Sequence, residues 1–394
     1  MRSIAAAATV LLLIAWMAQA DPADHAICRQ QDDNAITACL RIIADKTESA
    51  HSRAWALMLL GNIRDYGGDH DGAISDYDQA LDLDPDNANI HFNRGLAWHN
   101  QGDHDRAITD FTEGIRLDGK FAAAYGSRGV DWHDKGDGAR AIADYSEALR
   151  LNPNDADAYF NRGLVWQDQG DNDRAIADFT AAVRLDPKAA DAYRMRGIAW
   201  RAKGDDKHAI ADYDEAIRLD PKDMKAYSAR AHALAEAHEL EGAIADYAAL
   251  IRLDPRNAGA YADRAGAWLA KGNLDDALAD CAEALRLDPN NFIAFANCGS
   301  VWAQKGDFDR AIADYDAAIR LNQTNPVIYI NRGHAWFRKG NIDRAIANYT
   351  EALRLDPKNA EAYARRGAAW RAKGDVQRAD ADLNAVKELK THAN

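Results

Sequence analysis

The sequence predicts an all-α protein built from ten stacked helical hairpins that follow a short N-terminal cap. The main observation is a 34-residue period that runs without insertion through most of the 394 residues. Ala175 has an alanine counterpart in every unit, and a glycine or alanine recurs at the position of Gly163. Aromatic residues recur at the position of Phe179, with Cys281 and Leu383 as the departures. A period of this length is typical of repeat proteins in which each unit buries its apolar face against its neighbours.

Residues 1–20 have the pattern of a secretory signal peptide. Arg2 precedes an apolar run that ends at Ile14, and Ala18 and Ala20 supply a small-residue cleavage site. The run is short for a membrane span, which needs about 20 apolar residues, although a single membrane anchor is the alternative. We therefore expect cleavage after Ala20, a mature protein without stable membrane insertion, and export to a periplasm or, alternatively, secretion.

Residues 21–53 are expected to form a short helical hairpin that caps the array. Cys28 and Cys39 flank a polar turn symmetrically, and Cys281 and Cys298 flank another turn in the same way. Residues equidistant from the turn of an antiparallel hairpin lie level with one another. In an exported chain this predicts two disulfides, Cys28–Cys39 and Cys281–Cys298. The alternative is that these cysteines are small buried apolar residues.

Each repeat is predicted to contain two helices. Asp186 and Pro187 are expected to start a first helix, Gly204 to end it in a left-handed conformation, and Asp205 to begin the second. The repeat at 224–257 departs most from the others, because His238 replaces that glycine. The whole array spans residues 54–393. Its units are 54–87, 88–121, 122–155, 156–189, 190–223, 224–257, 258–291, 292–325, 326–359 and 360–393.

The recurring positions match a known family pattern. In one unit they are Tyr159, Gly163, Trp166, Ala175, Phe179, Ala182 and Pro187. This pattern resembles the tetratricopeptide repeat over residues 54–393. The resemblance implies a right-handed superhelical solenoid of ten two-helix repeats, in which the first helices line a concave groove for a peptide or protein segment.

Two recurring side chains need a separate interpretation. Arginine replaces the leucine of the family at the position of Arg162, and we expect it to lie in the packing seam and pair with Asp144 or Asp178. Eight tryptophans recur at the position of Trp166. They share a helical stripe with Gly163, so we interpret them as core residues rather than as exposed aromatic platforms for a ligand.

By the same resemblance, the groove is expected to include polar and aromatic residues of the first helices. They are Phe92, Asn93, His99, His133, Asp134, Phe160, Asn161, Asp168, Arg194, Arg201, Asn297, Asn331, Phe337, Arg338, Arg365 and Arg371. Acidic residues predominate in the first four repeats and basic residues become frequent later. This predicts that a basic, apolar peptide segment lies along the N-terminal repeats. The family uses asparagine at the Asn161 position to hold a peptide backbone, but here asparagine is equally explained as part of this repeat subtype.

The sequence contains no motif for catalysis or cofactor binding. No Gly-rich phosphate loop, nucleophile elbow or Cys-x-x-Cys pair is present. The net charge of −14 argues against nucleic acid as a partner. His99 and His133 with Asp134 and Asp168 are interpreted as solvated surface residues rather than metal ligands. No repeat carries lysine at the position of Phe160, so binding of a C-terminal carboxylate in the manner of chaperone-binding family members is not expected.

The sequence therefore predicts a non-enzymatic interaction scaffold without cofactors that binds a protein or peptide outside the cytoplasm. The alternative is an accessory protein that binds polysaccharide or a small solute in an envelope export system.

Overall fold

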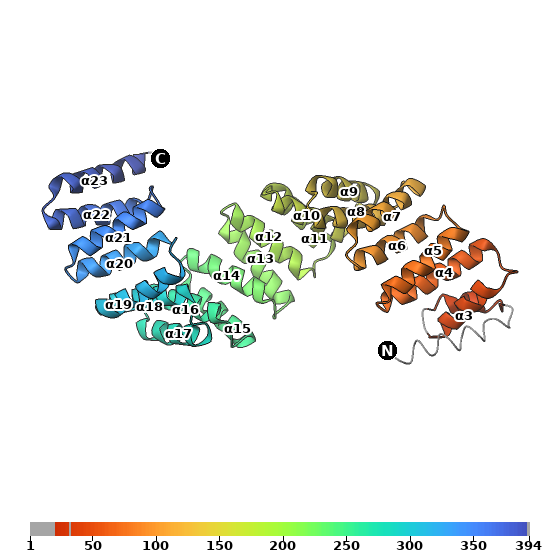
Figure 1. Cartoon of the computed structure of the whole chain (residues 1–394), viewed down its shortest axis with the longest axis horizontal. Helices are drawn as coiled ribbons and strands as arrows, with labels where there is room; N and C mark the ends of the chain where they lie inside the picture. Colours follow the sequence, from red (N-terminus) through yellow and green to blue (C-terminus); the bar gives the residue numbers. More distant parts are fainter. Residues whose placement is uncertain (1–19, 31–32, 392–394) are drawn as a thin grey trace. The chain divides into compact units, whose positions relative to one another are not determined.

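The computed structural model describes residues 20–30 and 33–391, and every regular element within them is a helix. The predicted signal segment up to residue 19 lies outside the described residues. The chain divides into two compact parts between Lys203 and Gly204. In Figure 1 the helices of each part follow one another in chain order. The all-α repeat class expected from the sequence is confirmed.

Residues 20–203, here called the first part, contain the cap and the first repeats. Their helices are α2 (Asp24–Cys28), α3 (Asp33–Ala44), α4 (Ala50–Tyr66), α5 (His70–Leu83), α6 (Ala88–Asn100), α7 (His104–Leu117), α8 (Ala122–Asp134), α9 (Gly138–Leu151), α10 (Ala156–Asp168), α11 (Asn172–Leu185) and α12 (Ala190–Ala202). Helix α4 begins at Ala50, four residues before the expected start of its repeat, because Ser49 caps it by accepting from the backbone N–H of Ser52.

Residues 204–391, here called the second part, continue the same alternation. Their helices are α13 (Asp206–Leu219), α14 (Met224–Glu236), α15 (Leu240–Leu253), α16 (Ala258–Lys271), α17 (Leu274–Leu287), α18 (Phe292–Lys305), α19 (Phe308–Leu321), α20 (Pro326–Arg338), α21 (Ile342–Leu355), α22 (Ala360–Lys373) and α23 (Val376–Thr391). Within each part the two helices of a repeat pack together, as α10 does with α11, and the first helices of successive repeats also touch, as α16 does with α18.

The turn inside most repeats has the predicted chemistry, but the turn between repeats does not. Gly204 has a φ of +80°, and Asp205 accepts from the backbone N–H of His208 at the start of α13. The expectation that Asp186 starts the next helix is wrong. Its carboxylate instead accepts from the backbone N–H of Lys188 at 2.9 Å within the turn, and α12 begins only at Ala190.

One repeat lacks the glycine that its turn requires. His238 has a φ of 60° and is the only described non-glycine residue with a positive φ. A β-carbon in the left-handed region is crowded by the following carbonyl, so this turn is locally strained.

The two helices of a repeat approach closely because glycine faces an aromatic ring. A β-carbon on Gly163 would lie 2.7 Å from Phe179 Cε1, and the Phe179 side chain is fully buried. Gly95, Gly299 and other members of the series meet a phenylalanine or tyrosine ring in the same way. Where the ring is replaced by Cys281, the glycine is replaced by Ala265, and both are fully buried. The extra methyl group therefore fills space that the smaller thiol leaves open.

The recurring arginines form a seam of ion pairs, as predicted. Arg162 donates from Nε and Nη2 to the two oxygens of Asp178, each at 2.8 Å, while its Nη1 donates to Ser146 Oγ in the preceding repeat at 3.0 Å. Of the two predicted partners, Asp178 is the one that binds. The same ion pair, between residues sixteen positions apart in sequence, recurs in five other repeats. These pairs are Arg94–Asp110, Arg128–Asp144, Arg230–Asp246, Arg264–Asp280 and Arg366–Asp382. Each arginine thus joins both helices of its own repeat.

The tryptophans are only partly core residues, which corrects the expectation. Trp166 packs against a buried cluster but remains half-buried, and the Arg174 guanidinium carbon lies 4.5 Å from its ring centroid. Seven counterparts are half-buried in the same way, each with an arginine or lysine over the ring: Trp98, Trp132, Trp200, Trp268, Trp302, Trp336 and Trp370. The cation explains the partial exposure, because it needs contact with both the ring and water. Since a cation covers each ring, the tryptophans give carbohydrate binding no support.

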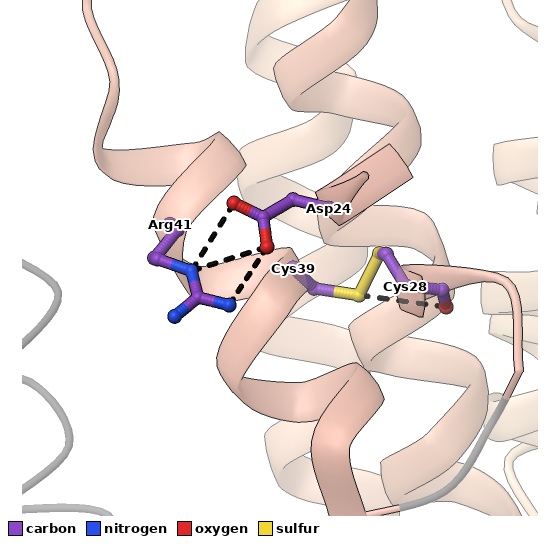
Figure 2. Close-up of a disulfide and its surroundings, with 4 residues drawn as sticks. All are labelled: Asp24, Cys28, Cys39 and Arg41. Atoms are coloured by element: carbon purple, nitrogen blue, oxygen red, sulfur yellow. Dashed lines mark hydrogen bonds and ion pairs between the residues drawn. A yellow bond between two sulfur atoms is a disulfide. The ribbon is translucent and has the colours of Figure 1, made fainter. Parts of the chain in front are cut away.

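The cap is held by a sulfur pair and a buried ion pair. The sulfur atoms of Cys28 and Cys39 lie 1.92 Å apart, at disulfide distance. Figure 2 shows Arg41 of α3 reaching the carboxylate of Asp24, which is 1% exposed and 2.7 Å from the guanidinium. The cap covers the first repeat, because Cys39 lies in one buried cluster with Leu60 of α4.

The second predicted disulfide, Cys281–Cys298, is not formed in the structure. Cys281 and Cys298 are both buried free thiols, although they lie in one cluster with Ala265 as their sequence positions implied. The Cys281 thiol donates to the carbonyl of Ala294 at 3.6 Å, and contact with Cys298 together with burial raises its pKa. A neutral thiol packed as a small apolar residue explains this pair, so hairpin symmetry predicted proximity but not oxidation.

Candidate functional site

The first helices of the first part carry the predicted aromatic positions. Phe92 is half-buried, with its ring centroid 4.8 Å from that of Phe121. Phe160 is half-buried against Phe179, at 5.7 Å between centroids. Both rings therefore keep one side accessible while the other side packs on the repeat.

A pocket of about 260 Å³ opens beside Phe160, where α10, α11 and α12 meet. Its apolar surface comes from Phe160 and alanines such as Ala182, and its carboxylates are Asp157, Asp186 and Asp191. Asp157 is exposed and has no hydrogen bond or ion pair within the described part of the chain. The pocket therefore combines an aromatic wall with an uncompensated negative charge.

The predicted asparagines do not behave alike. Asn297 donates its amide N–H to the backbone carbonyl of Ala262 at 2.9 Å, so it holds the preceding repeat rather than an outside chain. By contrast, the amides of Asn93, Asn161 and Asn331 are half-buried and make no hydrogen bond among the described residues. The structural explanation therefore holds for Asn297, and the other amides are free to bond a ligand.

Two of the acidic residues of the first four repeats, Asp134 and Asp168, have histidine neighbours. Asp168 lies 2.8 Å from His133 Nε2, and Asp134 lies 4.0 Å from His104 Nδ1. His99 does not contact His133 but lies with its Nδ1 2.8 Å from Asp131 Oδ1. This hydrogen bond raises the pKa of His99. Histidines rather than arginines or lysines therefore pair with these carboxylates.

The predicted arginines of the first part are partly engaged. Arg194 is half-buried and pairs with Asp191, three residues earlier on α12. Arg201, near the end of the same helix, is also half-buried. Neither arginine adds a free positive charge to the pocket at Phe160.

The second part carries a positive cluster on α20 and α22. The Arg338 guanidinium carbon lies 5.2 Å from the centroid of the Phe308 ring, and Arg365 pairs with Glu361 at 2.7 Å. Burial lowers the pKa of His334, and the positive charges of Arg365 and Arg338 lower it further. Burial is the largest of these causes, and the nearby Glu361 carboxylate acts against the two arginines.

Two other predicted residues of the second part serve their own repeats. Arg371 pairs with Asp380 of α23 at 3.1 Å, and Phe337 packs against the buried cluster of the last repeats.

Sequence reasoning also missed Asp131 and His104. The available signal was that Asp131 occupies a position where the neighbouring repeats carry Ala97 and Val165.

No described helix has the length and apolarity required to cross a bilayer.

Family models match most of the repeat region. The model described as TPR repeat matches residues 61–102, 132–170, 299–340 and 333–374. Models described as Tetratricopeptide repeat match residues 167–223, 228–292 and 88–121. No curated protein matches the chain.

Several solved structures are similar. The MamA protein is 29% identical over 44% of this chain and 94% of its own, with a TM-score of 0.40. A thermophilic TPR protein of Thermus thermophilus is 25% identical over 46% of this chain and 98% of its own, with a TM-score of 0.41. The Cut9 complex with Hcn1 is 16% identical over 93% of this chain and 92% of its own, with a TM-score of 0.52, and shares the fold.

Proposed function

Because the chain belongs to the tetratricopeptide repeat family, we propose that it is a non-enzymatic scaffold that binds an extended protein or peptide segment on its first helices. The family is a typical protein-interaction family. Peptide binding at these helices is the specific part of the proposal. It is supported by the amides of Asn93 and Asn161, which are half-buried and make no hydrogen bond among the described residues.

The pocket beside Phe160 is the observation that carries the proposal. An apolar wall next to the free carboxylate of Asp157 suits a side chain with a long apolar stem and a cationic end. Arginine and lysine have this structure. The segment that binds is therefore basic and apolar, and its arginine or lysine enters this pocket.

Binding should be tested with a labelled synthetic peptide in which arginine and leucine alternate, measured by fluorescence anisotropy. Asp157→Lys should weaken binding by about 1–3 kcal/mol and flatten its salt dependence, because the peptide cation loses its partner. Phe160→Ala should weaken binding by a similar amount. A peptide with glutamate in place of arginine should not bind.

The matched control is Glu361→Lys, at the same register position in the last repeat. It should leave peptide binding unchanged. Equal binding to the original chain and to a folded Asp157→Lys, Phe160→Ala double variant would refute the pocket as the binding site.

We further propose that the mature protein begins at Asp21 and works outside the cytoplasm, in a periplasm. The backbone nitrogen of Asp21 lies 2.8 Å from Asp24 Oδ2, so cleavage after Ala20 leaves a positive α-amino group beside a buried carboxylate. N-terminal sequencing of the periplasmic protein should start at Asp21. An uncleaved chain in the membrane fraction would contradict this proposal and support the anchor.

A further inference from the structure

Four side chains with metal-binding atoms converge where repeats 88–121 and 122–155 meet. They are His99 at the end of α6, His104 at the first position of α7, and Asp131 and Asp134 on α8. Nδ1 of His99 and Nδ1 of His104 lie 2.8 and 2.7 Å from the same oxygen, Asp131 Oδ1. One ligand atom from each of the four residues lies within 4.8 Å of all the others.

Asp131 is the unusual member of this cluster. It is fully buried, and its second oxygen, Oδ2, has no hydrogen-bond partner among the described residues. A buried carboxylate oxygen without a partner is costly unless a cation or donor approaches it. The other nine repeats carry only apolar residues at this position: Ile63, Ala97, Val165, Ala199, Ala233, Ala267, Val301, Ala335 and Ala369. Packing therefore does not require the carboxylate.

The charges around the cluster also favour a cation. Within the described part of the chain, no lysine or arginine pairs with Asp131 or Asp134. With neutral imidazoles, the cluster carries two negative charges, which one divalent ion would neutralise. Asp134 is half-exposed, so its side of the cluster is open to an entering ion or water.

From these observations we propose that His99, His104, Asp131 and Asp134 bind one divalent transition-metal ion of the zinc type. Two imidazole nitrogens and two carboxylates are a ligand set that Zn²⁺ accepts in tetrahedral geometry. Ligand atoms about 2.1 Å from a tetrahedral ion are about 3.4 Å apart. The contacts of His99 and His104 with Asp131, at 2.8 and 2.7 Å, must therefore lengthen, and the 4.0 Å separation of His104 and Asp134 must shorten, each by less than about 1 Å. Both Nδ1 atoms lose their protons to become ligands.

The ion would join three helices of consecutive repeats. Its ligands come from α6, α7 and α8, so binding stabilises the junction between the two repeats and couples their unfolding. This role is independent of peptide binding at Phe160.

The preceding repeat provides an internal comparison. His70 Nδ1 pairs with Asp65 at 2.6 Å, at the register positions of His104 and His99. There, however, the position of Asp131 is occupied by Ala97, so no buried carboxylate completes a site. A histidine and aspartate pair at this turn therefore does not by itself make the cluster.

The test is titration of the chelator-treated full mature chain with Zn²⁺ alone, followed by calorimetry and by thermal unfolding. We expect one ion per chain and a higher melting temperature with zinc. Asp131→Ala places the residue of most other repeats at this position, and His104→Asn places the residue found at Asn172. Either change should weaken binding by more than the roughly tenfold loss that follows removal of an outer-shell partner.

His133→Ala is the control, because His133 pairs with Asp168 outside the cluster. It should bind zinc like the original chain. Co²⁺ in place of Zn²⁺ should give the visible absorption of a tetrahedral site, and Asp131→Ala should abolish that absorption. Absence of zinc binding to the original chain, or unchanged binding in a folded His104→Asn variant, would overturn the proposal.

Discussion

Asp314 is a seam carboxylate whose arginine partner is missing, and this makes a sharp prediction. Cys298 stands where the preceding repeat has Arg264, whose guanidinium binds Asp280 at 2.7 Å. Without that guanidinium, burial raises the pKa of Asp314 to about 6. We predict that Asp314→Asn stabilises the protein at neutral pH, whereas Asp280→Asn destabilises it.

The magnitude follows from the pKa. A rise from the ordinary 3.8 to about 6 corresponds to about 3 kcal/mol. Because the Asp314 side chain is only partly buried, solvent screening reduces the expected effect to about 1–2 kcal/mol. The folded protein holds the proton more tightly than the unfolded chain, so the relative stability is greatest below pH 3.8 and falls as the pH rises through about 6. The benefit of Asp314→Asn should therefore be absent at low pH and complete above about pH 6.

Asp280→Asn should act in the opposite direction, because it removes the charge that pairs with a half-buried arginine. We expect a loss of about 1–3 kcal/mol at neutral pH, since one hydrogen bond to Arg264 can remain. The next repeat but one shows such a bond, from Arg332 to Asn348 at 2.8 Å.

The assay is hydrogen exchange as a function of pH, read in α18 and α19 for the Asp314 variant and in α16 and α17 for the Asp280 variant. Local exchange is needed because repeat proteins unfold locally and a single melting temperature can hide the effect. Circular dichroism should first establish that both variants fold. If Asp314→Asn gave no gain in protection between pH 4 and 7, or a loss equal to that of Asp280→Asn, the reasoning about the missing arginine would be refuted.

Further predictions concern the turn, the helix crossing and the cap. His238→Gly should stabilise the chain by about 1 kcal/mol in denaturant unfolding, because it relieves the left-handed strain; a loss of stability would contradict this. Gly163→Ala should destabilise by about 1–3 kcal/mol through its clash with Phe179, and adding Phe179→Cys should recover part of this, so additive effects would count against the pairing. Reducing the Cys28–Cys39 pair should lower the stability of the cap by about 3 kcal/mol, seen as faster exchange in α3; unchanged exchange would show that packing alone holds the cap.

The repeat region was predictable because each helical feature is repeated and locally encoded. The sequence predicted that Arg162 pairs with an aspartate of a second helix, and the partner, Asp178, lies sixteen residues later in the same repeat. The contact of Gly163 with the Phe179 ring, at the same spacing, was seen only in the structure. The start of α12 was not predictable from Asp186 and Pro187 alone. Aspartate can cap a helix or close a turn with equal local chemistry, and only the three-dimensional turn selects between these roles.

The candidate site was predictable in its positions but less so in its partners. Phe160 and Asn161 were expected in the groove set, and both are half-buried as binding residues can be. The hydrogen-bond partner of Asn297 depends on the exact spacing of neighbouring first helices, which the repeat pattern does not specify. Likewise, the oxidation of Cys281 depends on sulfur geometry and redox conditions rather than on symmetry about a turn.

Departures from the repeat separate into those that another residue compensates and those that remain uncompensated. Cys281 is matched by Ala265, whose methyl group offsets part of the volume lost with the aromatic ring, so that change needs no ligand. The loss of arginine at Cys298 leaves Asp314 uncompensated, but its partial exposure lets it take a proton from solvent. Asp131 is also uncompensated at Oδ2, yet it is fully buried and already receives two imidazoles on Oδ1. Of these departures, Asp131 is therefore the one for which an external cation is the simplest remaining partner.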